Sequence, residues 1–129
     1  MNNVAVADVM KMHDRIIEVT GGLLGVRDHN LLESALNKPQ THLFGVERYE
    51  DVFSKAGALL EALAMYHPFN DGNKRTAMAA ADMYLFFNGV TVTFSSEEYE
   101  TFMLEVVRKR LSVDKIAGWF RAHQVVAQP

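Results

Sequence analysis

The chain has 129 residues, which suits one compact domain and is too short for two ordinary ones. Its 49% hydrophobic and 22% charged residues are typical of a folded globular protein and exclude a disordered or fibrous one. The net charge of −3 argues against general coating of nucleic acid, and the lack of cysteine excludes disulfides, thiolate catalysis and cysteine-based zinc sites.

The N-terminal segment MNNVAVADVMKMHD lacks the basic region and the uninterrupted apolar core of a secretion signal. No apolar run in the sequence approaches membrane-spanning length. We therefore expect a soluble cytoplasmic protein that acts away from the membrane and does not bind nucleic acid by itself.

Helical periodicity covers nearly the whole chain and predicts an all-α fold. The first predicted helix ends at the Gly-Gly pair at residues 21–22. The second follows a capping residue, either Asp28 or Asn30, and Pro39 ends it. Each helix carries its apolar residues along one side and should therefore pack through that side.

The middle of the chain contains the most apolar helices. Residues 40–47 have turn chemistry without a helical stripe, so we expect a loop or a short hairpin. A long amphipathic stripe then begins at Tyr49 and must end before Pro68. Residues 76–87 are apolar on every side except Asp82, which predicts a helix at the centre of the protein.

The last part of the chain continues the helical pattern after an Asn-Gly stop and a short extended segment, VTVTF. Ser95 or Ser96 caps a helix that has glutamates in its first turn and the basic residues 108–110 at its end. Because these charges oppose the helix dipole, we assign the basic run to helix stability. Ser112 caps a last helix, and residues 1–129 are predicted to form a single domain.

The stretch HPFNDGNKRT, which begins at His67, places several polar groups directly before the predicted central helix. Pro68 disfavours a helical conformation at His67, and Gly72 allows the backbone to approach a ligand closely. The helix is expected to start at about Asn73 or Lys74, where its first N–H groups lack partners and attract anions.

The charges of this stretch predict a nucleotide phosphotransfer site. Lys74 and Arg75 lie in a first turn, where cations are unfavourable unless an anion such as phosphate binds beside them. Asp71 is a hard oxygen ligand of the kind that holds Mg²⁺, and His67 can accept a proton near neutral pH. The alternative is that His67, Asp71 and Asn73 only cap a buried helix while the cations reach solvent.

HPFNDGNKRT also resembles the signature of the Fic/Doc family, HPFx[DE]GN[GK]R. GGLLGVRDHNLLESAL resembles the segment upstream of that signature in the death-on-curing (Doc) branch, and the similarity in element order spans roughly residues 8–110. The resemblance implies an all-α fold in which the signature joins a loop to a central helix.

Two positions depart from the adenylylating Fic pattern, which has a glycine and a second arginine where this chain has Lys74 and Met78. Both residues are typical of the Doc branch. The resemblance therefore implies a kinase that passes the γ-phosphate of ATP to a threonine of elongation factor Tu and is neutralised by a small antitoxin. A Fic-type adenylyltransferase is the nearest alternative.

The resemblance also implies roles for the first part of the signature. His67 would be the base that takes the proton of the target hydroxyl, and Phe69 would pack inward and anchor the loop. Asp71 would hold the Mg²⁺ that accompanies ATP.

Further roles follow for the helix start. Gly72 and Asn73 would present phosphate contacts, and Lys74 and Arg75 would neutralise charge on the transferred phosphate. Residues 40–47 correspond to the family's target-binding flap, where an extended target segment could pair by strand addition.

Other hypotheses stay open. A metal-dependent HD-type phosphohydrolase would use His13 and Asp14 with His67 and Asp71, although His13 fits a hydrogen-bonded core histidine better. A non-catalytic binding module is a further alternative, against which the intact polar loop counts.

An internal inhibitory helix of pattern [ST]xxxE[GN] is not expected. Ser96 and Glu100 match its first part, but Thr101 stands where Gly or Asn belongs. A helix cap followed by an acidic first turn explains these residues better.

Overall fold

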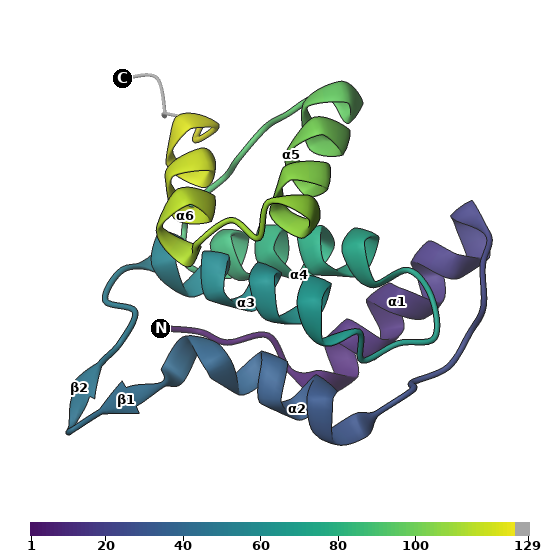
Figure 1. The fold of residues 1–129 in the computed structure, drawn as a ribbon, viewed down its shortest axis with the longest axis horizontal. Helices are drawn as coiled ribbons and strands as arrows, with labels where there is room; N and C mark the ends of the chain where they lie inside the picture. The colour runs from purple at the N-terminus through teal and green to yellow at the C-terminus, as the bar shows by residue number, and fades with distance from the viewer. Residues whose placement is uncertain (126–129) are drawn as a thin grey trace.

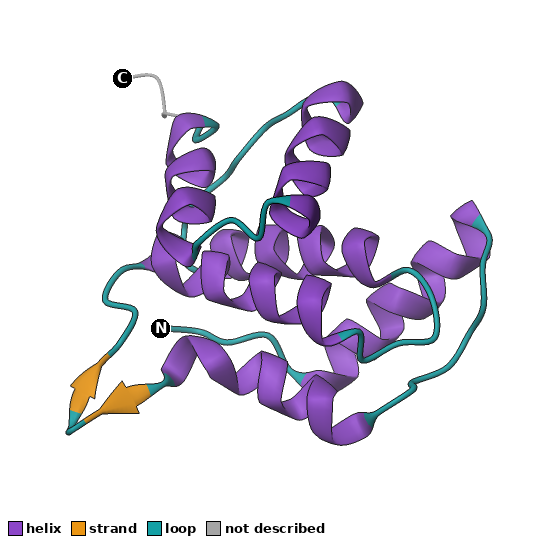
Figure 2. Cartoon of the chain, viewed as in Figure 1, coloured by secondary structure: helices purple, strands orange, loops and turns teal. Residues whose placement is uncertain are grey.

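The computed structural model describes residues 1–125, and within them the chain is almost entirely helical (Figures 1 and 2). The helices are α1 (Val6–Thr20), α2 (His29–Asn37), α3 (Val52–Tyr66), α4 (Asn73–Phe87), α5 (Ser96–Arg108) and α6 (Val113–Ala122). A short 3₁₀ helix, η1 (Lys38–Gln40), and a two-stranded hairpin, β1 (His42–Leu43) and β2 (Val46–Glu47), separate α2 from α3. The all-α prediction is confirmed; residues 126–129 of the predicted domain lie outside the described part.

Helices α3 and α4 pack against each other in the middle of the molecule (Figure 1). Helices α1 and α2 lie on one side of this pair, and α5 and α6 lie on the other. The helix after the HPFNDGNKR loop is buried as predicted, with Tyr84 and Leu85 fully enclosed. Its apolar pattern overstates burial only at the end, where Phe86 and Phe87 are exposed.

Side-chain caps fix where the helices begin. Asp28 caps α2, Ser95 caps α5 and Ser112 caps α6, each by accepting a backbone N–H of the first turn. The expected start of α3 near Tyr49 is wrong, because Asp51 caps this helix. Tyr49 instead lies in the preceding segment, where its side chain is nonetheless buried.

The hairpin is antiparallel, with Leu43 opposite Val46, and it agrees with the predicted loop or short hairpin at residues 40–47. It stands out from the helices beside the N-terminal end of α3, away from the loop that follows α3 (Figure 1). Buried Lys55 of α3 holds the chain on both sides of the hairpin. It donates to the carbonyls of Pro39 at 3.3 Å, before the hairpin, and of Tyr49 at 2.5 Å, after it.

None of the helices in residues 1–125 combines the length and apolarity needed to cross a membrane.

Candidate active site

The candidate site is built on the loop between α3 and α4, residues 67–72. Helix α3 ends at Tyr66 because His67 adopts a left-handed conformation, with φ 52° and ψ 56°, directly before Pro68. Gly72 is also left-handed, with φ 75°, and α4 begins at the next residue. Two left-handed residues therefore turn the chain between the helices.

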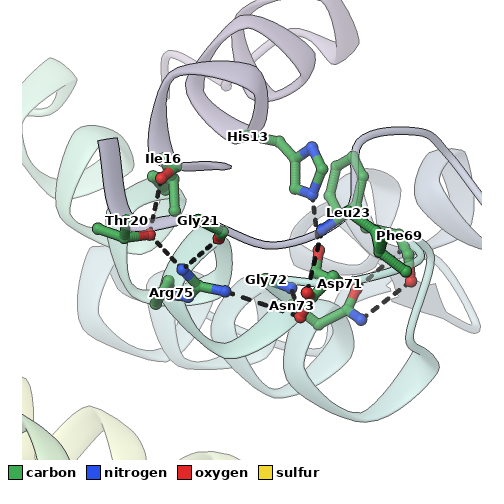
Figure 3. Close-up of polar contacts among 10 residues, drawn as sticks. All are labelled: His13, Ile16, Thr20, Gly21, Leu23, Phe69, Asp71, Gly72, Asn73 and Arg75. Carbon is green, nitrogen blue, oxygen red and sulfur yellow. Dashed lines mark hydrogen bonds and ion pairs between the residues drawn. The ribbon is translucent and has the colours of Figure 1, made fainter. Parts of the chain in front are cut away.

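The side of the loop that faces the protein interior is anchored in the core. Phe69 is buried, as predicted, and its ring stacks on that of His13 with 3.9 Å between centroids and 6° between planes. His13 donates from Nε2 to the carbonyl of Asp71 at 2.6 Å (Figure 3). A carbonyl only accepts, so this nitrogen carries the proton and cannot bind a metal.

His13 is therefore the hydrogen-bonded core histidine that its position on the apolar side of the first helix indicated. Within residues 1–125 no group of three or more His, Asp or Glu side chains could hold a metal ion.

Asn73 closes the loop with its side chain. Its Nδ2 donates to the carbonyl of Phe69 at 3.1 Å, and its Oδ1 accepts the Phe69 N–H at 2.9 Å. Both functions of the amide are thus used inside the loop (Figure 3). The phosphate contact expected from Asn73 is left to its backbone N–H.

The start of α4 has the features of an anion site. The first N–H groups of a helix have no helical partner, and Gly72 at the N-cap has no side chain that could satisfy them. Lys74 is exposed in this first turn. The N-terminus of a 15-residue helix and a cation therefore face the same space.

Arg75 is held differently. Its Nη1 donates to Thr20 Oγ1 and to the carbonyl of Gly21 at 3.2 Å, both at the C-terminal end of α1. Its Nη2 lies 3.7 Å from Oδ1 of Asp71 (Figure 3). Arg75 is thus fixed between α1 and the loop, in a position to share its charge with a ligand above Asp71.

Asp71 is held as a carboxylate. Its Oδ2 accepts the N–H of Leu23 at 3.1 Å, and its Oδ1 accepts the N–H of Gly72 at 2.8 Å. These two backbone hydrogen bonds, Leu23 first, hold the pKa of Asp71 below its usual value, and Arg75 adds to the effect. Each oxygen accepts only one of these N–H groups, so lone pairs remain for a cation.

The polar residues of the loop and of the first turn of α4 line one cavity of about 350 Å³. Its lining consists of His67, Asn70, Asp71, Gly72, Asn73, Lys74, Arg75 and Tyr99. The structure thus brings together every predicted site residue except Phe69, which supports the loop from below.

Tyr99 was missed because its position on α5 reads as part of an apolar stripe. Burial raises its pKa, so it reaches the cavity as a neutral hydroxyl.

A larger cavity of about 670 Å³ lies between α5 and α6. Its lining includes the stacked rings of Phe102 and Trp119, whose centroids are 4.0 Å apart. None of the residues predicted for the site lines it. The predicted site residues therefore belong to a smaller cavity than this one.

Residues 21–28 form an extended segment, here called the strap, that runs from α1 to α2 against the loop. Asn70 donates its N–H to the carbonyl of Gly25 at 3.1 Å, and Val26 pairs with Phe69 in an isolated β-bridge. At Gly22, with φ 120°, a Cβ would lie 2.5 Å from Oδ2 of Asp71. The glycine allows the strap to reach the site carboxylate.

Comparison with known proteins shows the family to which the chain belongs. The model of the Fic/DOC family matches residues 3–85, which include α1, the strap, the loop and most of α4. The chain is 42% identical over 110 residues to Toxin Doc of Mycolicibacterium smegmatis, covering 84% of this chain and 85% of that protein. It is 32% identical over 121 residues to Protein kinase doc of Escherichia phage P1, covering 94% of each. The chain therefore belongs to the Fic/Doc family.

Proposed function

We propose that the protein is a Doc-like toxin kinase, which transfers the γ-phosphate of ATP to a threonine of a translation factor and thereby arrests translation. Elongation factor Tu is the proposed target. The observation that carries the proposal is the convergence of a base, a carboxylate and two cations on one helix start: His67, Asp71, Lys74 and Arg75. The relative from phage P1, named a protein kinase, supports the same class of reaction.

In this proposal His67 is the general base. Its side chain is exposed at the cavity, where it can take the proton from the target hydroxyl as that oxygen attacks the γ-phosphorus. The bond from phosphorus to the bridging oxygen breaks, and ADP leaves. Lys74, Arg75 and the N–H groups of α4 stabilise the charge on the transferred phosphate, which is most of what phosphoryl transfer requires of a protein.

Asp71 is the residue that fits Mg²⁺. The protein offers this ion one carboxylate instead of a complete cage, which is the usual arrangement when phosphates and water supply the other ligands. When bound, the ion would neutralise part of the phosphate charge. The two backbone hydrogen bonds on Asp71 fix the direction in which its remaining lone pairs point.

The orientation of ATP follows from two residues. Met78 occupies the position of the second arginine of adenylylating relatives, and its side chain is buried in the core with 5% exposure. It offers a terminal phosphate no charged contact. Lys74 places a cation beside the helix start instead, which favours binding of the γ-phosphate there.

We also propose that a small cognate antitoxin neutralises the protein; the relative from Mycolicibacterium smegmatis is named a toxin. An internal inhibitor does not fit α5. Ser96 begins this helix and Ser95 with Glu98 forms its capping box, while Tyr99 is the residue of α5 that reaches the cavity.

The position of the transferred label tests the proposal. Purified protein is incubated with elongation factor Tu, Mg²⁺ and ATP labelled at either the α- or the γ-phosphate. We expect label from the γ-position only, with a phosphate increment on a threonine in the mass spectrum. Label from the α-position with an AMP increment would replace the kinase by a Fic-type adenylyltransferase, and no label on any protein of a cell extract would favour a binding module.

A further inference from the structure

The turn that carries His67 is held by one residue of the strap, Arg27. Its Nε donates to the carbonyl of His67 at 2.7 Å, and its Nη2 donates to the carbonyl of Tyr66 at 3.0 Å. Its backbone N–H donates to the carbonyl of Pro68 at 2.7 Å. Arg27 therefore binds the carbonyl oxygens of three consecutive residues, from the last residue of α3 to the second residue of the loop.

His67 requires such support because of its backbone conformation. A left-handed conformation at φ 52° brings Cβ close to the following carbonyl, and although His adopts it more often than most residues other than glycine, it remains uncommon. Pro68 narrows the choice further by disfavouring the right-handed helical region at His67. The carbonyls at the end of α3 also lack helical partners, and a cation there complements the helix dipole.

We propose that Arg27 is a positioning residue that fixes the backbone of His67 and so directs its imidazole into the cavity. This inference rests on the proposed role of His67 as the base. Arg27 does not itself line the cavity, so it is not placed to touch ATP or the transferred phosphate. Its effect should therefore appear in the rate of the chemical step and not in nucleotide binding.

The geometry requires arginine in particular. The planar guanidinium presents its Nε–H and Nη–H in fixed directions that match two adjacent carbonyls, whereas a lysine ammonium is a single point charge. Arg27→Lys keeps the charge and loses the paired bonds, and Arg27→Ala loses both. Arg15→Ala is the matched control, because Arg15 of α1 is 74% exposed and, among residues 1–125, forms an ion pair only with Glu18, at 3.8 Å.

The first experiment does not depend on activity. Amide hydrogen exchange is measured for Phe69 and Asn70, whose N–H groups are bonded within the loop and to the strap. We expect exchange to be about tenfold faster or more in Arg27→Ala, with unchanged exchange in the middle of α3 and wild-type rates in Arg15→Ala. Unchanged exchange of the loop amides in Arg27→Ala would overturn the proposal.

The second experiment measures phosphotransfer with Mg·ATP and elongation factor Tu. Arg27→Ala and Arg27→Lys should lower kcat by about tenfold to a hundredfold while KM for Mg·ATP stays within about twofold. Guanidinium ion at non-denaturing concentration should partly restore kcat of Arg27→Ala and leave that of Arg27→Lys unchanged.

The outcomes separate the two proposals. If the wild-type protein transfers no phosphate, the proposed function is wrong, and the exchange experiment alone decides the role of Arg27 in holding the turn. If the wild-type protein is active and Arg27→Ala keeps its kcat, or if only its KM for Mg·ATP changes, Arg27 is not a positioning residue for the base.

Discussion

Lys74 and Arg75 are adjacent cations that the structure places in different environments. Arg75 is bound to Thr20 and to the carbonyl of Gly21, so its position is set before any ligand arrives. Lys74 is exposed, and within residues 1–125 no hydrogen bond or ion pair holds its ammonium group. A guanidinium held by the protein and an exposed ammonium beside it would suit the proposed transfer reaction, because the first defines the site and the second is open to the phosphate.

His67 should be essential for transfer but not for folding. His67→Ala removes an exposed side chain, so we expect loss of activity by a factor of about 10² or more with little change in stability. Phosphotransfer and growth arrest on expression measure the first effect, and thermal unfolding followed by circular dichroism measures the second. His29→Ala, an exposed histidine on α2, is the control. Full activity of His67→Ala would mean that another group accepts the proton.

At the scale of elements, the strap shows where sequence reasoning reached its limit. The pattern GGLLGVRD could be matched to a family segment, but its physical role appears only when residues 21–28 lie against the loop. The helices and most of their caps were predictable because they depend on residues within one turn. The bond from His13 to Asp71 joins residues 58 positions apart, and no local pattern encodes it.

Dependence on tertiary packing also explains which features of the site could be predicted from the sequence and which could not. The tendency of His13 to be a hydrogen-bonded core residue could be predicted from its helix face, and it is confirmed. The use of the Asn73 amide inside the loop and the approach of Tyr99 from α5 depend on tertiary packing. Loop residues could be nominated by their chemistry, whereas their hydrogen-bond partners required the fold.

The glycines of the strap give a prediction about its contact with Asp71. Gly21 and Gly22 both have positive φ, so alanine at either position should cost about 1–2 kcal/mol of stability. Only at Gly22 would the new Cβ collide with the Asp71 carboxylate, because no atom of the described residues 1–125 lies within 4 Å of a Cβ at Gly21. Gly22→Ala should therefore also weaken Mg²⁺-dependent ATP binding, measured by calorimetry. Equal binding by the two variants would show that Asp71 does not depend on the strap.

Lys55 provides a prediction for the hairpin. Its buried Nζ donates to two backbone carbonyls and to Glu47 at 3.2 Å. Lys55→Met should destabilise the protein by about 2 kcal/mol or more, because those carbonyls lose their partner while buried. Urea denaturation measures the loss, and limited proteolysis should show faster cleavage near the exposed Phe44. Lys11→Met, at an exposed position of α1, should change neither result; an intact, protease-resistant hairpin in Lys55→Met would contradict the anchoring role.

For the whole molecule, carboxylates that accept backbone N–H groups, Asp71 and Glu98 among them, make stability depend on pH in the acid range. The backbone N–H of Leu23 lowers the pKa of Asp71, and that of Ser95, followed by His123, lowers the pKa of Glu98. A carboxyl group whose pKa is lower in the folded state stabilises the fold above its ordinary pKa near 4, and this contribution is lost as the pH falls through the folded value. The temperature of unfolding should therefore decrease as the pH is lowered from about 5 to 3.

Asp82 has the opposite effect on the pH dependence of stability. Burial on α4 raises its pKa, so the folded state disfavours its carboxylate and the charge destabilises the fold near pH 7. This destabilisation disappears as the pH falls and the group binds a proton. Asp82→Asn should accordingly raise the unfolding temperature by about 1–2 °C at pH 7 and by less at pH 3. Asp14→Asn, whose parent side chain is 70% exposed, serves as the control and should show no such gain at either pH. A gain for Asp82→Asn that is equal at both pH values would assign the effect to packing of the amide and not to removal of a buried charge.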